Sequence, residues 1–285
     1  MRVLELGQAE EVLVNLWDKI ADHYDQYRAR VFEPPAKELV MRAGIEKGSR
    51  VLDIGTGTGI AALEALEMVG SEGYVLGVDS SEGLVAVAQK KAQMKGGENL
   101  EFRRMTMASL DLPDDSFDHV IGNYSVCCTP RYERAVEEAY RVLRQGGRFS
   151  YNHEGPHEHP VRTVFKKTLA KHQVKQPSSD TRQVRGASAL LEARWGRFKD
   201  PFLALQALEA AGFRNREATV TFERRIYSEL DDYLDYKLSG SVEIPEMGQQ
   251  REEKLREDLL SSLSPFLSGG GLVLNLEVLY LSGHR

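Results

Sequence analysis

A glycine-rich segment between two aspartates is the part of the sequence whose residue types and spacing indicate chemistry. In the segment VLDIGTGTG, Asp53 stands ahead of Gly55, Gly57 and Gly59, after a short apolar stretch and before a helical pattern. Glycines at such a point allow a tight turn and let a ligand lie against bare backbone at a helix N-terminus. Asp79 follows twenty residues after Gly59, where a carboxylate can accept hydrogen bonds from both hydroxyls of an adenosine ribose.

Three interpretations of this segment compete. A P-loop requires a Lys-Ser/Thr pair that is absent, and a dinucleotide-binding loop has the spacing G-x-G-x-x-G, whereas here Ile60 directly follows the third glycine of G-x-G-x-G. The third interpretation concerns Asp53, which precedes the first glycine. The structural alternatives are a bare strand–helix turn for the glycines and, for Asp79, a helix N-cap that Ser80 or Ser81 would serve equally.

Strands and helices alternate around this segment. Short strands are predicted over 50–54, 74–78, 100–103, 118–122 and 147–152, and helices over 60–69, 82–94 and 132–143. Before them, residues 9–30 have helical periodicity, and Pro34 and Pro35 are expected in the first turn of a following helix. The alternation predicts a parallel sheet covered on both faces, in an α/β doubly wound domain.

The acid before a G-x-G-x-G loop, with a second acid ending the next strand, resembles the class I S-adenosylmethionine (SAM)-dependent methyltransferases. The segments LPDDSFDHVIGNYS at 112–125, RAVEEAYRVLRQGGRF at 134–149 and LEAAGF at 208–213 resemble that family's sequence around its fourth, fifth and sixth strands. The resemblance spans about 20–223 and is similar to small-molecule enzymes such as the ubiquinone and menaquinone biosynthesis methyltransferases.

This resemblance implies SAM as the cofactor. SAM has no phosphates, so the loop needs no lysine, and the carboxylate of Asp53 suits the ammonium group at the methionine end while Asp79 would hold the ribose. The cofactor-binding residues that we expect are Asp53, Gly55, Thr56, Gly57, Gly59, Asp79, Ser80, Met107, Ala108, Asn123 and Tyr24.

Two of these positions have alternatives. Relatives place an acid near the adenine amino group, where this chain has Met107. We expect Met107 to pack on the adenine face and the Ala108 amide to bond a ring nitrogen, with core packing as the alternative for a methionine here. Tyr24 is expected either to bond the SAM carboxylate or to pack on the sheet as part of an aromatic helix face.

Tyr124 and His153 are the candidate catalytic residues. Methyl transfer from a sulfonium depends mainly on alignment and needs a base only if the nucleophile arrives protonated. Asn123 and Tyr124 end the fourth strand beside the expected methyl position, and His153 after the fifth strand is the predicted base for an acceptor hydroxyl. With His157 and His159 it forms the segment HEGPHEH, but the Gly-Pro pair would break any helix that aligned the three, so no metal site is predicted.

Composition and charge limit the classes of protein further. The 285 residues are 41% hydrophobic and 28% charged, as in a globular protein, and the net charge of −6 argues against general nucleic-acid binding. No apolar run is long enough to span a membrane and no export segment is visible, so we expect a cytoplasmic protein. The adjacent Cys127 and Cys128 exclude a disulfide framework and a zinc site made of cysteines alone.

We therefore expect one methyltransferase-like domain over 1–285, with a mostly parallel, seven-stranded Rossmann-like sheet and an antiparallel final strand. An N-terminal helical cap is expected over 1–48, and helical insertions over 157–200 and 229–268 would cover the acceptor side. The expected reaction methylates the O, N or C atom of a small organic molecule and releases S-adenosylhomocysteine. The alternatives are an NAD(P)-dependent oxidoreductase, a non-catalytic SAM-binding protein, and RNA or protein methylation through the basic 157–200 segment.

Overall fold

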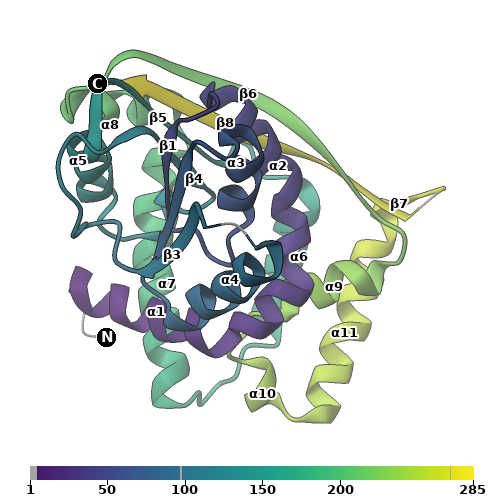
Figure 1. The fold of residues 1–285 in the computed structure, drawn as a ribbon. Helices are drawn as coiled ribbons and strands as arrows, with labels where there is room; N and C mark the ends of the chain where they lie inside the picture. Colours follow the sequence, from purple (N-terminus) through teal and green to yellow (C-terminus); the bar gives the residue numbers. More distant parts are fainter. Residues whose placement is uncertain (1–4, 97, 270) are drawn as a thin grey trace.

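A mixed β-sheet lies at the centre of the molecule (Figure 1). The computed structural model describes residues 5–96, 98–269 and 271–285, and within them the strand order is β3-β2-β1-β4-β5-β8-β6, with the short β7 paired to β8. The strands are β1 (Arg50–Ile54), β2 (Tyr74–Asp79), β3 (Leu100–Arg104), β4 (Phe117–Asn123), β5 (Leu143–Glu154), β6 (Arg214–Tyr227), β7 (Leu267–Ser268) and β8 (Gly271–His284). The strands from β3 to β5 are parallel, while β8 is antiparallel to both β5 and β6. The α/β class, the mostly parallel sheet and the antiparallel final strand are therefore confirmed.

Helices cover both faces of this sheet. They are α1 (Leu6–His23), α2 (Ala29–Ala43), α3 (Ile60–Val69), α4 (Glu82–Lys95), α5 (Tyr132–Val142), α6 (Pro160–Lys171), α7 (Ser179–Phe198), α8 (Pro201–Ala210), α9 (Leu230–Leu238), α10 (Ile244–Met247) and α11 (Gln249–Leu263). One face packs against α2, α3 and α4, and the other packs against α5 and α8. Val51 faces the first group while Leu52 and Ile54 face the second, and all three are fully buried. A strand buried on both faces is what a parallel sheet between two helical layers requires.

The N-terminal region differs from the prediction at its two prolines. A π-helical turn, Tyr24–Arg28, joins α1 directly to α2, so Pro34 and Pro35 lie inside α2 and not in its first turn. Each proline removes one helical hydrogen-bond donor. The helix continues past them because one of its faces, which includes Leu39 and Val40, is buried against the sheet.

Three helices form a separate core beside the sheet. In Figure 1 the long strands β6 and β8 extend beyond the other strands toward α9 and α11. Buried side chains of α6, α9 and α11 pack there with Leu272 and Leu274 of β8. Helices α6 and α7 fall within 157–200, and α9, α10 and α11 fall within 229–268, where helical insertions are predicted. Within the described part of the chain, no helix is both long and apolar enough to cross a membrane.

Candidate functional site

A cavity of about 310 Å³ opens where the parallel strands of the sheet end. Its wall includes residues from the ends of β1, β2, β4 and β5, and from α1, α6, α9, β6 and β8. The carboxyl ends of parallel strands are the usual ligand site in doubly wound sheets. Of the predicted site residues, those that line this cavity are Tyr24, Asp53, Gly55, Thr56, Gly57, Asp79, Ser80, Met107, Asn123 and Tyr124.

The glycine loop forms the floor of the cavity, and its three glycines have different roles. All three have positive φ, +65° at Gly55, +57° at Gly57 and +87° at Gly59. A Cβ atom on Gly55 would lie 2.5 Å from the Cβ of Ser125 and 2.6 Å from the Cε of Met107, so only a glycine fits there. Gly59 is the N-cap of α3 and lies outside the cavity wall, so it shapes the turn and is not placed to touch a ligand.

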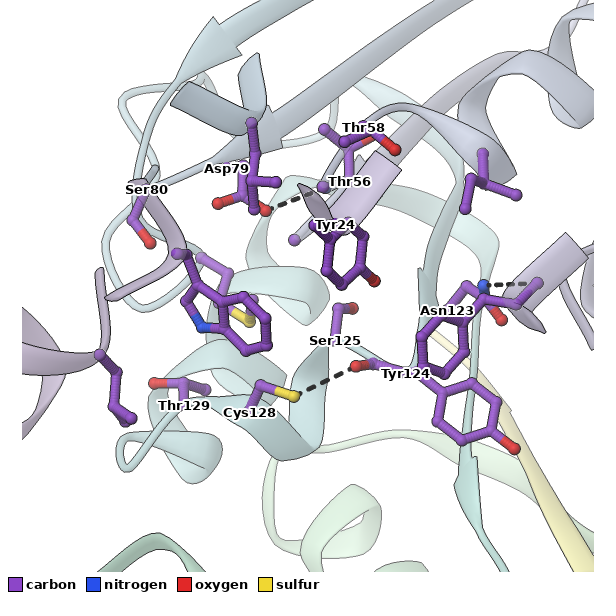
Figure 2. A pocket seen from close by; sticks show the side chains of 18 of the residues that line it. Tyr24, Thr56, Thr58, Asp79, Ser80, Asn123, Tyr124, Ser125, Cys128 and Thr129 are labelled. Carbon is purple, nitrogen blue, oxygen red and sulfur yellow. Dashed lines mark hydrogen bonds between the residues drawn. The ribbon is translucent and has the colours of Figure 1, made fainter. Parts of the chain in front are cut away.

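Asp79 ties the glycine loop to the start of α4. Its Oδ2 accepts a hydrogen bond from the Gly57 amide at 2.9 Å (Figure 2). Its Oδ1 accepts one from the Ser81 amide at 2.9 Å. Burial raises the pKa of this carboxyl group, partly offset by these amide hydrogen bonds. Ser81 caps α4 by accepting from the Leu84 amide, so the N-cap alternative for Asp79 is wrong. The Asp79 carboxylate and Ser80 both face the cavity.

Asp53 is a buried carboxyl group whose hydrogen bonding is incomplete. Its Oδ2 accepts a 2.6 Å hydrogen bond from Thr56 Oγ1, but its Oδ1 is buried and has no hydrogen-bond partner. Burial raises the pKa of Asp53 to about 7, against the opposing effects of the Thr56 hydrogen bond and of the nearby Ala62 backbone amide. A buried acceptor without a donor is costly, so this position suits a ligand that brings a positive charge or an N–H donor.

Aromatic side chains lie over the middle of the cavity. Tyr24 stacks on Phe32 at 6.3 Å between ring centroids, and Phe32 in turn contacts Tyr124 at 5.0 Å. Figure 2 shows the Tyr24 ring between Asp79 on one side and Asn123 and Tyr124 on the other. The side-chain amide of Asn123 donates to the Phe32 carbonyl at 3.2 Å. Tyr124 has φ of +50°, a conformation that bulky residues rarely adopt and that is found mainly at functional positions.

His153 is placed differently from the prediction. Alternation along β5 points Glu154 into the cavity and turns His153 to the opposite face, where its ring lies beside Tyr151 and is buried. Burial lowers the pKa of His153 to about 4, and its Nε2 has no hydrogen-bond partner. The histidine therefore does not reach the reacting groups, and we withdraw it as the base.

Ala108, His157 and His159 lie outside the cavity wall. Ala108 is buried outside the cavity wall, and its amide donates to Thr106 Oγ1 at 3.3 Å, so the expected contact with a ring nitrogen is not formed by this geometry. His157 bonds Glu277, while His159 accepts from a backbone amide at the start of α6. Among the residues that the structure describes, no group of histidines, cysteines and carboxylates is arranged to hold a metal ion.

Helix α1 contributes side chains to the cavity that were not predicted from the sequence. Glu10, Leu13 and Trp17 line the cavity, at the spacing of one helix face. Glu10 accepts a 3.0 Å hydrogen bond from Thr106 Oγ1, which places its carboxylate beside Met107. The helical periodicity of this segment was visible in the sequence, but periodicity indicates only that one face is covered, by sheet or by ligand.

The side chains on the β5–β6 side of the cavity were likewise not predicted from the sequence. Arg162 of α6, Arg225 of β6, and Tyr236 and Lys237 of α9 line the cavity together with Glu154. These residues come from segments after the fifth strand, for which no motif was identified. Cys128 also lines the cavity, and its Sγ donates to the Tyr124 carbonyl at 3.2 Å, while Cys127 is buried.

Comparisons with known proteins agree with this architecture. The sequence profile of a family described as "Methyltransferase domain" matches residues 45–210, more than half of the chain. The demethylmenaquinone methyltransferase of Geobacillus kaustophilus is 32% identical over 142 residues, which are 48% of this chain and 61% of that protein. The aklanonic acid methyltransferase DauC of a Streptomyces species is 35% identical over 135 residues, 47% of this chain and 61% of that protein. These matches thus span less than two thirds of the relatives' length.

A solved structure extends the similarity over most of the fold. The YcgJ protein of Bacillus subtilis superposes with a TM-score of 0.56 and 25% sequence identity. The superposition covers 88% of this chain and 97% of that one.

Proposed function

Because this chain belongs to the methyltransferase domain family, we propose that it transfers the methyl group of SAM to a small organic molecule and releases S-adenosylhomocysteine. The observation that carries the proposal is the cavity at the strand ends, where the glycine loop, Asp53 and Asp79 converge. The match to the family bears out the sequence resemblance from which SAM was inferred as the cofactor. The O, N or C nature of the acceptor atom stays open.

The residues present fit this cofactor. SAM supplies an electrophilic methyl group on a sulfonium, and its amino-acid end carries an ammonium group. The unpartnered Oδ1 of Asp53 offers that ammonium a buried anionic acceptor. The bare backbone around Gly55 and Gly57 lets a ligand approach closely, and the Asp79 carboxylate can accept from the ribose hydroxyls.

We also propose that Glu10 and Thr106 replace the acid that relatives place near the adenine amino group. Both line the cavity beside Met107, and they are joined by a hydrogen bond of 3.0 Å. Glu10 is further held by Arg131, whose Nε lies 3.1 Å from its Oε2. The carboxylate is thus fixed above the β3 end of the cavity, where it can accept from an amino group, while Met107 packs on the ring face.

The remaining task of the protein is to align the acceptor and exclude water. Tyr24, Phe32 and Tyr124 form an aromatic wall between the cofactor side and the β5–β6 side. Tyr124 is held in position by its backbone amide, which donates to Asn152 Oδ1 at 2.9 Å. We propose that Tyr124 positions the acceptor, because its strained backbone aims the ring at the middle of the cavity.

Calorimetric titration of the purified chain with S-adenosylhomocysteine, SAM and NADH tests the proposal. We expect micromolar binding of the two SAM-type ligands and none of NADH. The Asp79→Ala variant loses the ribose acceptor and should bind S-adenosylhomocysteine at least about tenfold more weakly, as expected for a lost charge-assisted hydrogen bond. Asp111→Ala removes an exposed carboxylate that does not line the cavity and should leave the affinity unchanged.

The outcomes separate the alternatives. NADH binding without SAM binding would favour an oxidoreductase and overturn the proposal. Tight binding of S-adenosylhomocysteine with no methyl transfer to any acceptor would indicate a SAM-binding protein without turnover. Salt-dependent RNA binding would support a nucleic-acid acceptor instead. A cytoplasmic location and the absence of nucleic-acid partners stay predictions.

A further inference from the structure

The charges around the cavity are separated along the sheet. Asp53 and Asp79 stand at the ends of β1 and β2, and Glu10 of α1 lines the cavity with them. In the strand order β3-β2-β1-β4-β5-β8-β6, the opposite end of the cavity is bounded by β5, β8 and β6. Three cationic side chains, Arg162, Arg225 and Lys237, line that opposite end, as does a single carboxylate, Glu154. One side is therefore suited to a cationic ligand and the other to an anion.

The two carboxylates that pair with Arg162 are each shared with a second cation. Glu154 contacts Arg162 and also Lys199, whose Nζ lies 3.1 Å away. Glu158 likewise is shared, with Arg162 at 3.2 Å and Lys166 at 3.1 Å. Each carboxylate thus faces two cations. Burial would raise the pKa of Glu154, but the charges of Arg162 and Lys199 outweigh burial and hold it at about 2, so Glu154 stays ionised and is a poor base.

Arg225 is held in the wall by a carboxylate, and Lys237 lies against two aromatic rings. Glu223 binds Arg225 through two hydrogen bonds of 2.7 Å, and both side chains are mostly buried. This fork geometry fixes the plane of the guanidinium group. The Nζ of Lys237 lies 5.5 Å from the centroid of the Phe165 ring and 5.6 Å from that of Tyr236. Cations fixed in this way lose little side-chain entropy when they bind a ligand.

Aromatic side chains accompany these cations. Phe32, Tyr124 and Tyr236 line the same part of the cavity, and the guanidinium carbon of Arg225 lies 6.0 Å from the centroid of Phe32. Leu276 of β8 completes an apolar surface between them. Planar rings favour offset or edge contacts with other rings, so the wall suits an aromatic body next to a charged group.

We propose that the acceptor is an aromatic molecule with an anionic oxygen group, a carboxylate or an ionised phenol, which Arg225 and Lys237 hold on the β5–β6 side of the cavity. This inference rests on the proposed function, because only then does this side of the cavity belong to the acceptor. When the anionic oxygen is the methylated atom, its lone pair forms the new O–CH3 bond as the S–CH3 bond breaks and S-adenosylhomocysteine leaves. No proton is lost in that step, so the position of His153 outside the cavity is no obstacle.

The test compares three probes of one shape and different charge. The full-length protein, saturated with S-adenosylhomocysteine, is titrated with 2-naphthoate, neutral 2-naphthamide and cationic 2-naphthylmethylamine. We expect 2-naphthoate to bind at least about tenfold more tightly than the amide, because one charge-assisted contact supplies a difference of that size. The cation should bind most weakly. Lys237→Gln should reduce this preference to within about threefold, and Lys237→Arg should restore it. Arg225 is left in place because its loss would strand the buried Glu223.

Lys167→Gln is the matched control, since Lys167 is exposed on α6 and does not line the cavity. It should leave the preference for 2-naphthoate intact. Equal affinity for 2-naphthoate and 2-naphthamide, or no binding of either while S-adenosylhomocysteine binds, overturns the inference and leaves the proposed function standing. Failure to bind S-adenosylhomocysteine overturns both. A preference that Lys237→Gln does not change overturns the role of this lysine.

Discussion

Asp53 is the residue whose chemistry depends most on whether the cavity is filled. In the free protein its carboxyl group is buried with one oxygen unpartnered, and burial raises its pKa to about 7. An ammonium group placed against it would favour the ionised form and lower that pKa again. Ligand binding and proton release are therefore linked at this position.

The first prediction concerns the pH dependence of cofactor binding. Below pH 7 the Asp53 carboxyl group of the free protein is mostly protonated, so binding an ammonium-bearing ligand must release that proton. The affinity for S-adenosylhomocysteine should fall by up to about tenfold for each pH unit from 7 downward. Calorimetry between pH 5 and 8, in buffers of different ionisation enthalpy, measures both the affinity and the released proton.

Asp53→Asn supplies the comparison for this prediction. The variant keeps an acceptor for Thr56 but has no titratable group, so its affinity should be lower at pH 8 and nearly flat with pH. The pKa of Asp79 is also raised by burial, but Asp79 titrates in both proteins, so their difference isolates Asp53. An unchanged pH profile in Asp53→Asn would contradict the role assigned to this residue.

Within the glycine loop, substitutions at two glycines distinguish the cost of backbone strain from the cost of steric contact. Gly55 and Gly57 both have positive φ, but a Cβ atom on Gly57 meets nothing within 4 Å, whereas one on Gly55 would collide with Ser125 and Met107. Gly57→Ala should lower the free energy of unfolding by about 1–2 kcal/mol, the cost of a left-handed residue with a Cβ. Gly55→Ala should cost about 1–3 kcal/mol more because it also overpacks the site.

Urea denaturation of the two variants and the parent protein measures this difference, with Gly57→Ala as the control for strain. S-adenosylhomocysteine binding to folded Gly55→Ala should be lost, because the loop has to shift to relieve the collision. Equal losses of stability in the two variants would show that the loop yields easily. In that case the close packing of Gly55 on Ser125 would not hold the loop in place.

Only part of the site could be predicted from the sequence. The glycine loop and Asp79 were found because strand, loop and helix are contiguous, so their spacing in sequence fixes their spacing in space. His153 was misplaced because β5 is buried on both faces near its end, and a continuous buried run does not reveal which side chains face a ligand. Arg225 and Lys237 were missed because their position depends on how far the antiparallel β6–β8 pair extends, which no local pattern fixes.

In the whole molecule, the hydrophobic core is divided into clusters that support different sides of the cavity. Two clusters fill the two faces of the sheet and support the glycine loop, while a third joins α6, α9 and α11 with the far ends of β6 and β8. Lys237 and Arg162 come from helices of this third cluster, whereas Asp53 and Asp79 end strands packed in the first two. The cavity is therefore built from parts with separate cores, and the two ligand sides can be perturbed independently.

Leu259→Ala tests this independence. Leu255, Leu259 and Leu263 lie one helical turn apart on α11 and are fully buried in the third cluster, so truncating the central leucine should cost about 2–5 kcal/mol locally. Amide hydrogen exchange should become faster in α6, α9 and α11 but not in β1, β2 or β4. Binding of 2-naphthoate should weaken. The affinity for S-adenosylhomocysteine should stay within about twofold, because the glycine loop is supported by the other two clusters. Leu203→Ala, a truncation at a leucine 38% exposed on α8, is the control and should change stability by less than about 0.5 kcal/mol. A parallel loss of S-adenosylhomocysteine binding in Leu259→Ala would mean that the third cluster holds the cofactor side in place as well, and that the two halves of the cavity fold as one unit.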